Sequence, residues 1–326
     1  MNNTPRPMNN TPRPININNK VWLKPFATPM VEDAFKFVTQ IVIDGYTGAV
    51  IWGPTRTGKT SLIRLFVNDV KKVKGRRGDE IESGAVSMKC KDRWVMSEGG
   101  FWDWQLRQFG HNRAGARDPV QIKRHIACEF LKGIAAQSPS GRVIVFIDEA
   151  QLLELVELGL FADQFNDLEE DGFEMVLFLV GSYNIKKWQL DLKGNSDHAH
   201  VRSRFFSQEH RLRGLSTLKD YQRCLKRYDV DKSYFDGERS ITEYYQADWY
   251  KSGERLEQYA AMFKDAFAEA IGRPQSFQVP MAYFKYTVQN VLNRPKMVIT
   301  PDRMKNLVKR SKFVFNYTPD TEANTD

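Results

Sequence analysis

The sequence predicts an α/β domain built on a parallel sheet, followed by a smaller, all-helical domain. Short β-branched runs alternate with helical segments, and the strongest run, Val143–Ile147, is typical of a strand buried on both faces. A glycine-rich turn joins an earlier apolar strand to the helix that follows it. From Ser216 onward the pattern is helical. Alternation of this kind favours parallel strands joined by crossover helices.

The elements of the first domain can be placed by their periodicity and by their end signals. Thr28 is expected to cap the first helix, with Pro29 at its first position. Asp118, Pro119 and Gln121 are expected to open a later helix in a capping arrangement. The expected helices are Thr28–Ile43, Lys59–Val73, Phe101–Phe109, Asp118–Ala136 and Leu152–Leu168. The expected strands are Gly48–Trp52, Ala85–Lys89, Val143–Ile147, Met175–Val180 and Gln208–Leu212.

The composition is that of a water-soluble protein without a membrane segment. The chain has 326 residues, and its longest apolar run, Met175–Val180, is much shorter than the roughly 20 residues of a membrane helix. The three cysteines, Cys90, Cys128 and Cys224, show no CxxC spacing, so we expect a reduced, cytoplasmic protein without structural zinc. The net charge of +8 favours a polyanionic partner. Basic residues cluster at Lys71–Arg77, Arg202–Arg213, Arg223–Arg227 and Arg303–Lys312.

Four segments are expected along the chain. The sequence MNNTPRP occurs twice at the start, and residues 1–20 are expected to form a disordered arm. Residues 21–215 are expected to form the α/β nucleotide-binding domain, and residues 216–312 a helical lid. The lid contains an aromatic-rich stretch, Tyr234–Tyr250, which could pack internally or recruit a partner. Residues 313–326 are expected to form a disordered tail.

A complete phosphate-binding motif follows the first strand. Gly53–Thr60 reads GPTRTGKT and matches G-x-x-x-x-G-K-[ST] between an expected strand and an expected helix. Its backbone amides can wrap phosphates, Lys59 is expected to reach the β- and γ-phosphates, and the Thr60 hydroxyl is expected to hold Mg²⁺. The cofactors are therefore ATP and Mg²⁺. The residues expected at the nucleotide are Gly53, Pro54, Thr55, Arg56, Thr57, Gly58, Lys59, Thr60 and Ser61.

A pair of carboxylates ends the strand Val143–Ile147. Asp148 is expected beside the metal, and Glu149 is placed to polarise the attacking water of an ATPase. The alternative is that both carboxylates only cap the next helix. Since small-molecule kinases need no water-activating glutamate, the pair favours hydrolysis.

Two further features are candidates for the hydrolytic machinery. The strand Met175–Val180 ends in a turn where Ser182 or Asn184 could sense the γ-phosphate, although an ordinary turn would look the same. Arg204, with Arg202 as second choice, could enter the site of a neighbouring subunit and stabilise transition-state charge. The alternative for both arginines is a solvated basic helix end.

The ordered motifs GPTRTGKT, VIVFIDEAQ, FLVGS and VRSRFF resemble those of the AAA+ ATPases of DNA transposition, the TnsC, TniB and IstB group. The resemblance covers roughly Trp22–Leu215, with a weaker helical likeness to about Lys312. It implies a P-loop AAA+ fold of the ASCE type with a helical lid, and an ATPase that forms homo-oligomeric rings or filaments on double-stranded DNA. It also implies a DDE transposase and a TniQ-type target-selection protein as partners, in the nucleoid-associated cytoplasm of a bacterium.

The same resemblance points to a DNA-contacting hairpin at Phe101–Arg124. Basic side chains there would follow the phosphate backbone, so binding would tolerate different sequences. The aromatic residues of the segment could instead belong to the core. The residues expected to contact DNA are Trp104, Arg107, Arg113, Arg117 and Lys123.

Two other classes share the nucleotide motifs. An origin-recognition ATPase has the same core but normally adds a winged-helix DNA reader after the lid, where the sequence is still helical up to about Lys312. A signalling or defence ATPase of the STAND type would use nucleotide as a switch and would ignore DNA. In any of these classes, Arg273 is a candidate sensor arginine of the lid.

Overall fold

The computed structural model describes residues 28–69, 83–91, 97–186, 188, 192, 198–233, 237–272, 276–294 and 298–316. The expected N-terminal arm, most of the expected tail, the basic run 71–77 and Arg273 lie outside these residues. The chain divides into two compact units. The α/β unit comprises Pro25–Ser216 and Ser276–Ala282, and the helical unit comprises Thr217–Gln275 and the segment that begins at Tyr283. Among the described helices, none has the length and apolarity needed to cross a membrane.

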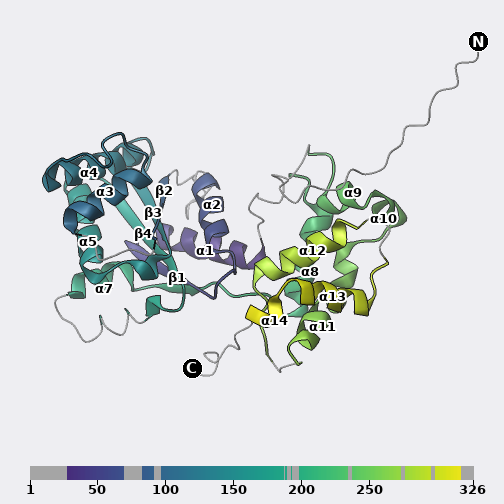
Figure 1. Ribbon diagram of the computed structural model, residues 1–326. Coiled ribbons are helices and arrows are strands. Elements are labelled where there is room, and N and C mark those ends of the chain that lie inside the picture. Colours follow the sequence, from purple (N-terminus) through teal and green to yellow (C-terminus); the bar gives the residue numbers. More distant parts are fainter. Residues whose placement is uncertain are drawn as a thin grey trace, which may run out of the picture. The chain divides into compact units, whose positions relative to one another are not determined.

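The α/β unit contains a five-stranded parallel sheet in the order β2-β3-β4-β1-β5 (Figure 1). This topology confirms the predicted fold class. The order places β1 between β4 and β5, so the carboxyl ends of β3, β4 and β1 lie side by side. The strands are β1 (Gly48–Trp52), β2 (Gly84–Lys89), β3 (Arg142–Asp148), β4 (Glu174–Gly181) and β5 (Glu209–Arg211).

Helices cover both faces of the sheet, with α1 and α2 on one face and α3, α4, α5 and α7 on the other (Figure 1). Alternate residues of β3 therefore face different helices. Val145 joins the core formed with α3, α4 and α5, whereas the Phe146 ring packs against Phe66 of α2 with centroids 5.1 Å apart. The helices are α1 (Pro29–Ile43), α2 (Lys59–Asp69), α3 (Glu98–Gln108), α4 (Val120–Ala136), α5 (Leu155–Glu170) and α7 (Ala199–Phe205).

The ends of these helices test the predicted capping residues. Thr28 caps α1 as predicted, because its hydroxyl accepts a hydrogen bond from the Val31 amide at 3.3 Å and Pro29 is the first helical residue. The capping arrangement predicted for α4 is wrong. Pro119 is the N-cap residue and provides no side-chain cap, while the Asp118 carboxylate accepts a hydrogen bond from Arg113 Nε at 3.0 Å. The Asp118 carboxylate, which was expected to cap α4, is therefore paired with Arg113 instead.

The helical unit is organised around a buried carboxylate on α8. Asp229 accepts hydrogen bonds from Thr242 Oγ1 at 2.7 Å and from the amides of Leu256 and Glu257, each at 3.0 Å. Burial raises the pKa of this carboxyl despite these donors. The unit's helices are α8 (Leu218–Val230), α9 (Ile241–Tyr245), α10 (Ala247–Ser252), α11 (Ala260–Ala270), α13 (Pro301–Arg310) and α14 (Phe313–Asn316), together with α12 (Met281–Leu292) from Tyr283 onward.

Candidate functional site

The phosphate-binding motif forms the turn between β1 and α2, and its glycines are required by the backbone. A Cβ atom on Gly53 would lie 2.2 Å from the Leu212 carbonyl oxygen, a distance that no larger residue tolerates. Gly58 has a φ of +109°, in the region that side chains disfavour. The lack of space for a side chain at Gly53 and the positive φ of Gly58 therefore explain why the motif has glycine at both positions.

Lys59 lies folded over this turn. Its ammonium donates hydrogen bonds to the carbonyl oxygens of Gly53 at 2.9 Å and Pro54 at 2.8 Å. Burial lowers the pKa of Lys59, while the nearby carboxylates of Glu149 and Asp148 act in the opposite direction. The buried Lys59 ammonium at this turn is placed to form an ion pair with the phosphates of a nucleotide.

Asp148 and Thr60 meet at the carboxyl end of the sheet. Asp148 is the last residue of β3 and is buried, and its Oδ2 accepts a hydrogen bond from Thr60 Oγ1 at 2.7 Å. A carboxylate and a hydroxyl are hard oxygen ligands of the kind that Mg²⁺ prefers. These two groups fit a magnesium ion held jointly with nucleotide phosphates.

Glu149 has an unusual backbone conformation, with φ at 57° in the left-handed region. Its amide donates to Asp148 Oδ1 at 3.1 Å, and its carbonyl accepts from the Leu152 amide at 3.0 Å. A left-handed conformation costs a non-glycine residue of order 1 kcal/mol, so these contacts hold Glu149 in a defined place. The residue therefore begins a tight turn rather than a regular helix.

Sequence reasoning missed a third residue of this turn. Gln151 Nε2 donates a hydrogen bond to Glu149 Oε2 at 2.7 Å, and Gln151 Oε1 accepts one from the Ser182 amide at 2.9 Å. The structure thus brings Ser182 to the same site through its backbone, whereas Asn184 is exposed. The only signal in the sequence was that Gln151 closes the motif VIVFIDEAQ.

The comparisons with known proteins agree with this geometry. Residues 43–189 match the family model described as "AAA domain". This α/β unit is an AAA+ ATPase domain. No curated protein matches the chain.

Solved structures resemble the chain in fold. The Walker-type ATPase paby2304 of Pyrococcus abyssi is 14% identical, with 90% of this chain and 77% of that chain covered and a TM-score of 0.51. Drosophila ORC bound to DNA is 11% identical, with 89% and 69% covered and a TM-score of 0.51. At such identities the likeness concerns the fold, and it agrees with the AAA+ domain described above.

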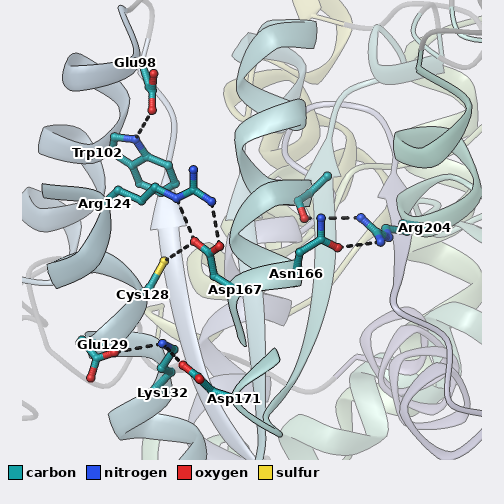
Figure 2. A network of polar contacts seen from close by, with 11 residues as sticks. Glu98, Trp102, Arg124, Cys128, Glu129, Lys132, Asn166, Asp167, Asp171 and Arg204 are labelled. Atoms are coloured by element: carbon teal, nitrogen blue, oxygen red, sulfur yellow. Dashed lines mark hydrogen bonds and ion pairs between the residues drawn. The ribbon is translucent and has the colours of Figure 1, made fainter. Parts of the chain in front are cut away.

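The arginines predicted for a neighbour's site lie on α7 of the AAA+ domain. Arg204 Nη2 donates to Asn166 Oδ1 at 2.8 Å (Figure 2). The Arg204 guanidinium also lies 4.9 Å from the centre of the Phe165 ring on α5. Arg202 is exposed, and its Nη1 donates to the Leu192 carbonyl at 3.4 Å. The Arg204 partners Ala162 and Asn166 both belong to α5, and a role of either arginine in the site of a neighbouring subunit stays a prediction.

The α3–α4 segment carries the residues predicted to contact DNA, and the structure corrects one of them. Trp104 is 8% exposed, packs among the core residues, and donates from Nε1 to the Lys89 carbonyl at 3.4 Å. Its ring cannot serve as a stacking platform, so we remove it from the set. This burial agrees with the alternative that the aromatic residues of the segment belong to the core, and it involves Phe161 of α5, whose ring centre lies 6.4 Å away.

The four cations of this segment differ in their partners. Asp103 Oδ2 accepts from Arg107 Nε at 2.8 Å and Asp103 Oδ1 lies 3.6 Å from Lys123 Nζ. Arg113 pairs with Asp118, as described above, and keeps 52% of its side chain exposed. Arg117 is exposed in the turn before α4. Lys123, whose side chain is only 13% exposed, is thus the least well placed of the four to meet an external phosphate. Arg107 keeps 60% of its side chain exposed, and Arg113 and Arg117 are exposed as well.

A network of polar contacts joins α4 to α5 (Figure 2). Arg124 and Asp167 form a two-pronged ion pair, with both nitrogen–oxygen distances at 2.8 Å. Asp167 also accepts from Cys128 Sγ, and burial together with Asp167 raises the pKa of this thiol to about 12. Lys132 pairs with Asp171 one turn farther along. These contacts hold the two helices at a fixed register.

Proposed function

We propose that this chain is an ATP-dependent regulator of DNA transposition that oligomerises on double-stranded target DNA. It would link a TniQ-type target-selection protein to a DDE transposase, in the nucleoid-associated cytoplasm of a bacterium. The observation that carries the proposal is an ATPase site and an exposed basic turn, around Arg113 and Arg117, within one AAA+ domain. The motifs that resemble the TnsC, TniB and IstB group support transposition as the process served.

In the proposed site, the phosphate-binding turn holds the nucleotide. Backbone amides of the turn cradle the phosphates, and Lys59 leaves its two carbonyl partners to contact the β- and γ-phosphates. Thr60 and Asp148 would hold Mg²⁺, which would neutralise phosphate charge. The remaining residues of the turn shape it: Gly53, Pro54, Thr55, Arg56, Thr57, Gly58 and Ser61.

Glu149 serves as the general base in this proposal. It accepts a proton from water as the water oxygen bonds to the γ-phosphorus, and the bond from that phosphorus to the bridging oxygen breaks to release ADP. Ser182, tied to the same turn through Gln151, is placed to sense the γ-phosphate. Loss of the base should therefore affect hydrolysis and spare binding.

The proposed contact between neighbouring subunits is made by α7. We infer that Arg204, with Arg202 as second choice, stabilises transition-state charge in the site of a neighbouring subunit. The contact with Asn166 orients the Arg204 guanidinium on the surface of α5. Subunits related in this way would build a ring or a helical filament.

Basic side chains of the α3–α4 segment bind the phosphate backbone in this proposal, without reading the sequence of bases. Each phosphate that is neutralised contributes about −0.9 to the slope of log affinity against log salt concentration. Arg113 and Arg117 are both exposed in the segment between α3 and α4, so we take them as the two contacts to be tested first. Two contacts per subunit give a slope of about −1.8, multiplied by the subunits bound.

An origin-recognition-like function is the second candidate, favoured by the fold similarity to Drosophila ORC bound to DNA. It also predicts ATP-dependent DNA binding, but on DNA of a replication origin and without a transposase. A STAND-type nucleotide switch predicts no DNA binding. The first two candidates are separated by a strand-transfer assay with the transposase of a neighbouring reading frame, which only a transposition regulator should stimulate.

The primary test is a salt titration of fluorescent duplex binding with and without ATP. Wild-type protein should bind duplexes of unrelated sequence, more tightly with ATP, and should lose affinity steeply as salt rises. The double variant Arg113→Ala/Arg117→Ala should flatten the slope at unchanged ATP affinity. The matched control is Lys36→Ala/Arg64→Ala, which removes two exposed cations from α1 and α2. Absence of ATP-dependent duplex binding even at low salt would overturn the proposal and favour the nucleotide switch.

A further inference from the structure

The side chain of Gln151 bridges two segments of the ATPase site. Its Nε2 lies 2.7 Å from Glu149 Oε2, and its Oε1 lies 2.9 Å from the amide nitrogen of Ser182. Glu149 follows β3 and Ser182 follows β4, so one amide joins the ends of two neighbouring strands. The bridge consists of side-chain hydrogen bonds of Gln151 and is separate from the helix caps and from the apolar core.

The chemistry of the partners determines the orientation of the amide. An ionised carboxylate only accepts hydrogen bonds, and a backbone N–H only donates them. A glutamine is therefore matched to this pair, with its nitrogen toward Glu149 and its oxygen toward Ser182. Glutamate at position 151 could still accept from Ser182 but would place a second acceptor against the Glu149 carboxylate.

Gly181 leaves the space that the bridge occupies. A Cβ atom on Gly181 would lie 2.3 Å from Gln151 Oε1, which is closer than any real contact. Gly181 also pairs with Trp52 at the end of β1, and its carbonyl accepts from the amide of Gly53 at 3.2 Å. The bridged strand end is thereby joined to the first residue of the phosphate-binding turn.

We propose that Gln151 is a positioning residue that holds the Glu149 carboxylate for hydrolysis and couples it to the end of β4. This inference rests on the proposed role of Glu149 as general base. Gln151 itself takes no proton and contacts no phosphate. Because it acts through Glu149, its loss should lower the rate of hydrolysis and leave nucleotide affinity unchanged.

The test is a double-mutant cycle with Gln151→Ala and Glu149→Gln, measured as phosphate release at saturating ATP. Gln151→Ala should lower kcat about tenfold, the scale of one hydrogen bond to a charged group. KM, nucleotide affinity from calorimetry, and the melting temperature should stay at wild-type values. In the Glu149→Gln background the same change should have no further effect, since residues that act as a unit are not additive. Gln222→Ala, at an exposed position on α8, is the matched control.

Two further variants, Gly181→Ala and Gln151→Glu, test the position of the Gln151 amide and its hydrogen bond to Glu149. Gly181→Ala should displace the Gln151 amide and slow hydrolysis as Gln151→Ala does, and the double variant should be no slower than either single one. Gln151→Glu should be at least as slow as Gln151→Ala, since it keeps the acceptor for Ser182 but repels Glu149. Full activity of Gln151→Glu would show that the donor to Glu149 is not needed and would overturn the proposal.

The outcomes separate this inference from the proposed function. If Glu149→Gln hydrolyses ATP at the wild-type rate, the role of Glu149 fails and the inference fails with it. If Glu149→Gln is inactive while Gln151→Ala has a wild-type kcat, only the positioning role is refuted. A Gln151→Ala defect that persists in full in the Glu149→Gln background, or that follows a lower melting temperature, would show a structural role instead.

Discussion

The reciprocal pair of amides between α3 and α5 makes a quantitative prediction. Gln105 and Gln164 are both fully buried, and each Nε2 donates to the other's Oε1 at 3.1 Å. Replacing Gln164 by leucine removes both hydrogen bonds and leaves the donor and the acceptor of Gln105 without partners. A buried unsatisfied group costs about 1–3 kcal/mol, so the two together should lower the free energy of unfolding by about 2–6 kcal/mol. This is a large part of the ~5–15 kcal/mol of a typical domain.

Replacing both glutamines by leucine should recover most of that loss, because no polar group is then left unpaired. The measurement is urea denaturation followed by tryptophan fluorescence, which reports on this domain through the buried Trp102 and Trp104 of α3. Gln121→Leu, at an exposed position on α4, is the matched control and should change stability by less than about 0.5 kcal/mol. If the double variant loses as much as the sum of the two single variants, the amides are not coupled and the reasoning is wrong.

The remaining predictions concern the nucleotide and DNA sites. Lys59→Ala should abolish tight ATP binding, because the buried cation is lost, and an unchanged dissociation constant from calorimetry would contradict its assignment. Glu149→Gln should slow phosphate release about 10²-fold or more while keeping ATP bound. Arg204→Ala should lose hydrolysis but regain part of it when mixed with the Lys59→Ala protein; no rescue, with normal assembly of both variants, would argue against action in trans. Asp118→Asn should strengthen duplex binding at low salt by releasing Arg113 from its ion pair, and weaker or unchanged binding in the fluorescence titration would count against Arg113 as a DNA contact.

The strands of the AAA+ domain were predictable because their burial leaves a direct trace in the sequence. β3 and β4 are covered on both faces, which requires unbroken apolar runs, and both were expected within a residue or two of their observed ends. The first helix was equally clear, since Thr28 and Pro29 signal its start by local chemistry alone. Features that depend on neighbours in the sequence were therefore accessible.

Features that depend on distant neighbours were not. The carboxylate of Asp118 looked like a helix cap, but Arg113 competes for it in the folded turn. The sequence allowed Trp104 to be a DNA contact or a core residue, and only its contact with Phe161 of α5 decides for the core. Gln151 reaches a backbone amide 31 residues away along the chain, and such a pairing follows only from the strand order. The roles of Glu149 and the other proposed site residues stay predictions.

The segment Ser276–Ala282 has a practical consequence for dissecting this chain. It lies in the sequence between two parts of the helical unit, after α11 and before Tyr283 of α12, yet it belongs to the AAA+ domain. Val279 exchanges backbone hydrogen bonds with Leu215, at 2.9 and 2.8 Å, and the Ala282 amide donates to the Arg56 carbonyl inside the phosphate-binding turn at 3.2 Å. A fragment that stops at Ser216 would expose the backbone of Leu215 and remove a hydrogen-bond donor from the turn that is to hold ATP. No single cut releases an intact nucleotide-binding domain, and an isolated version would need this seven-residue piece spliced back by a short linker.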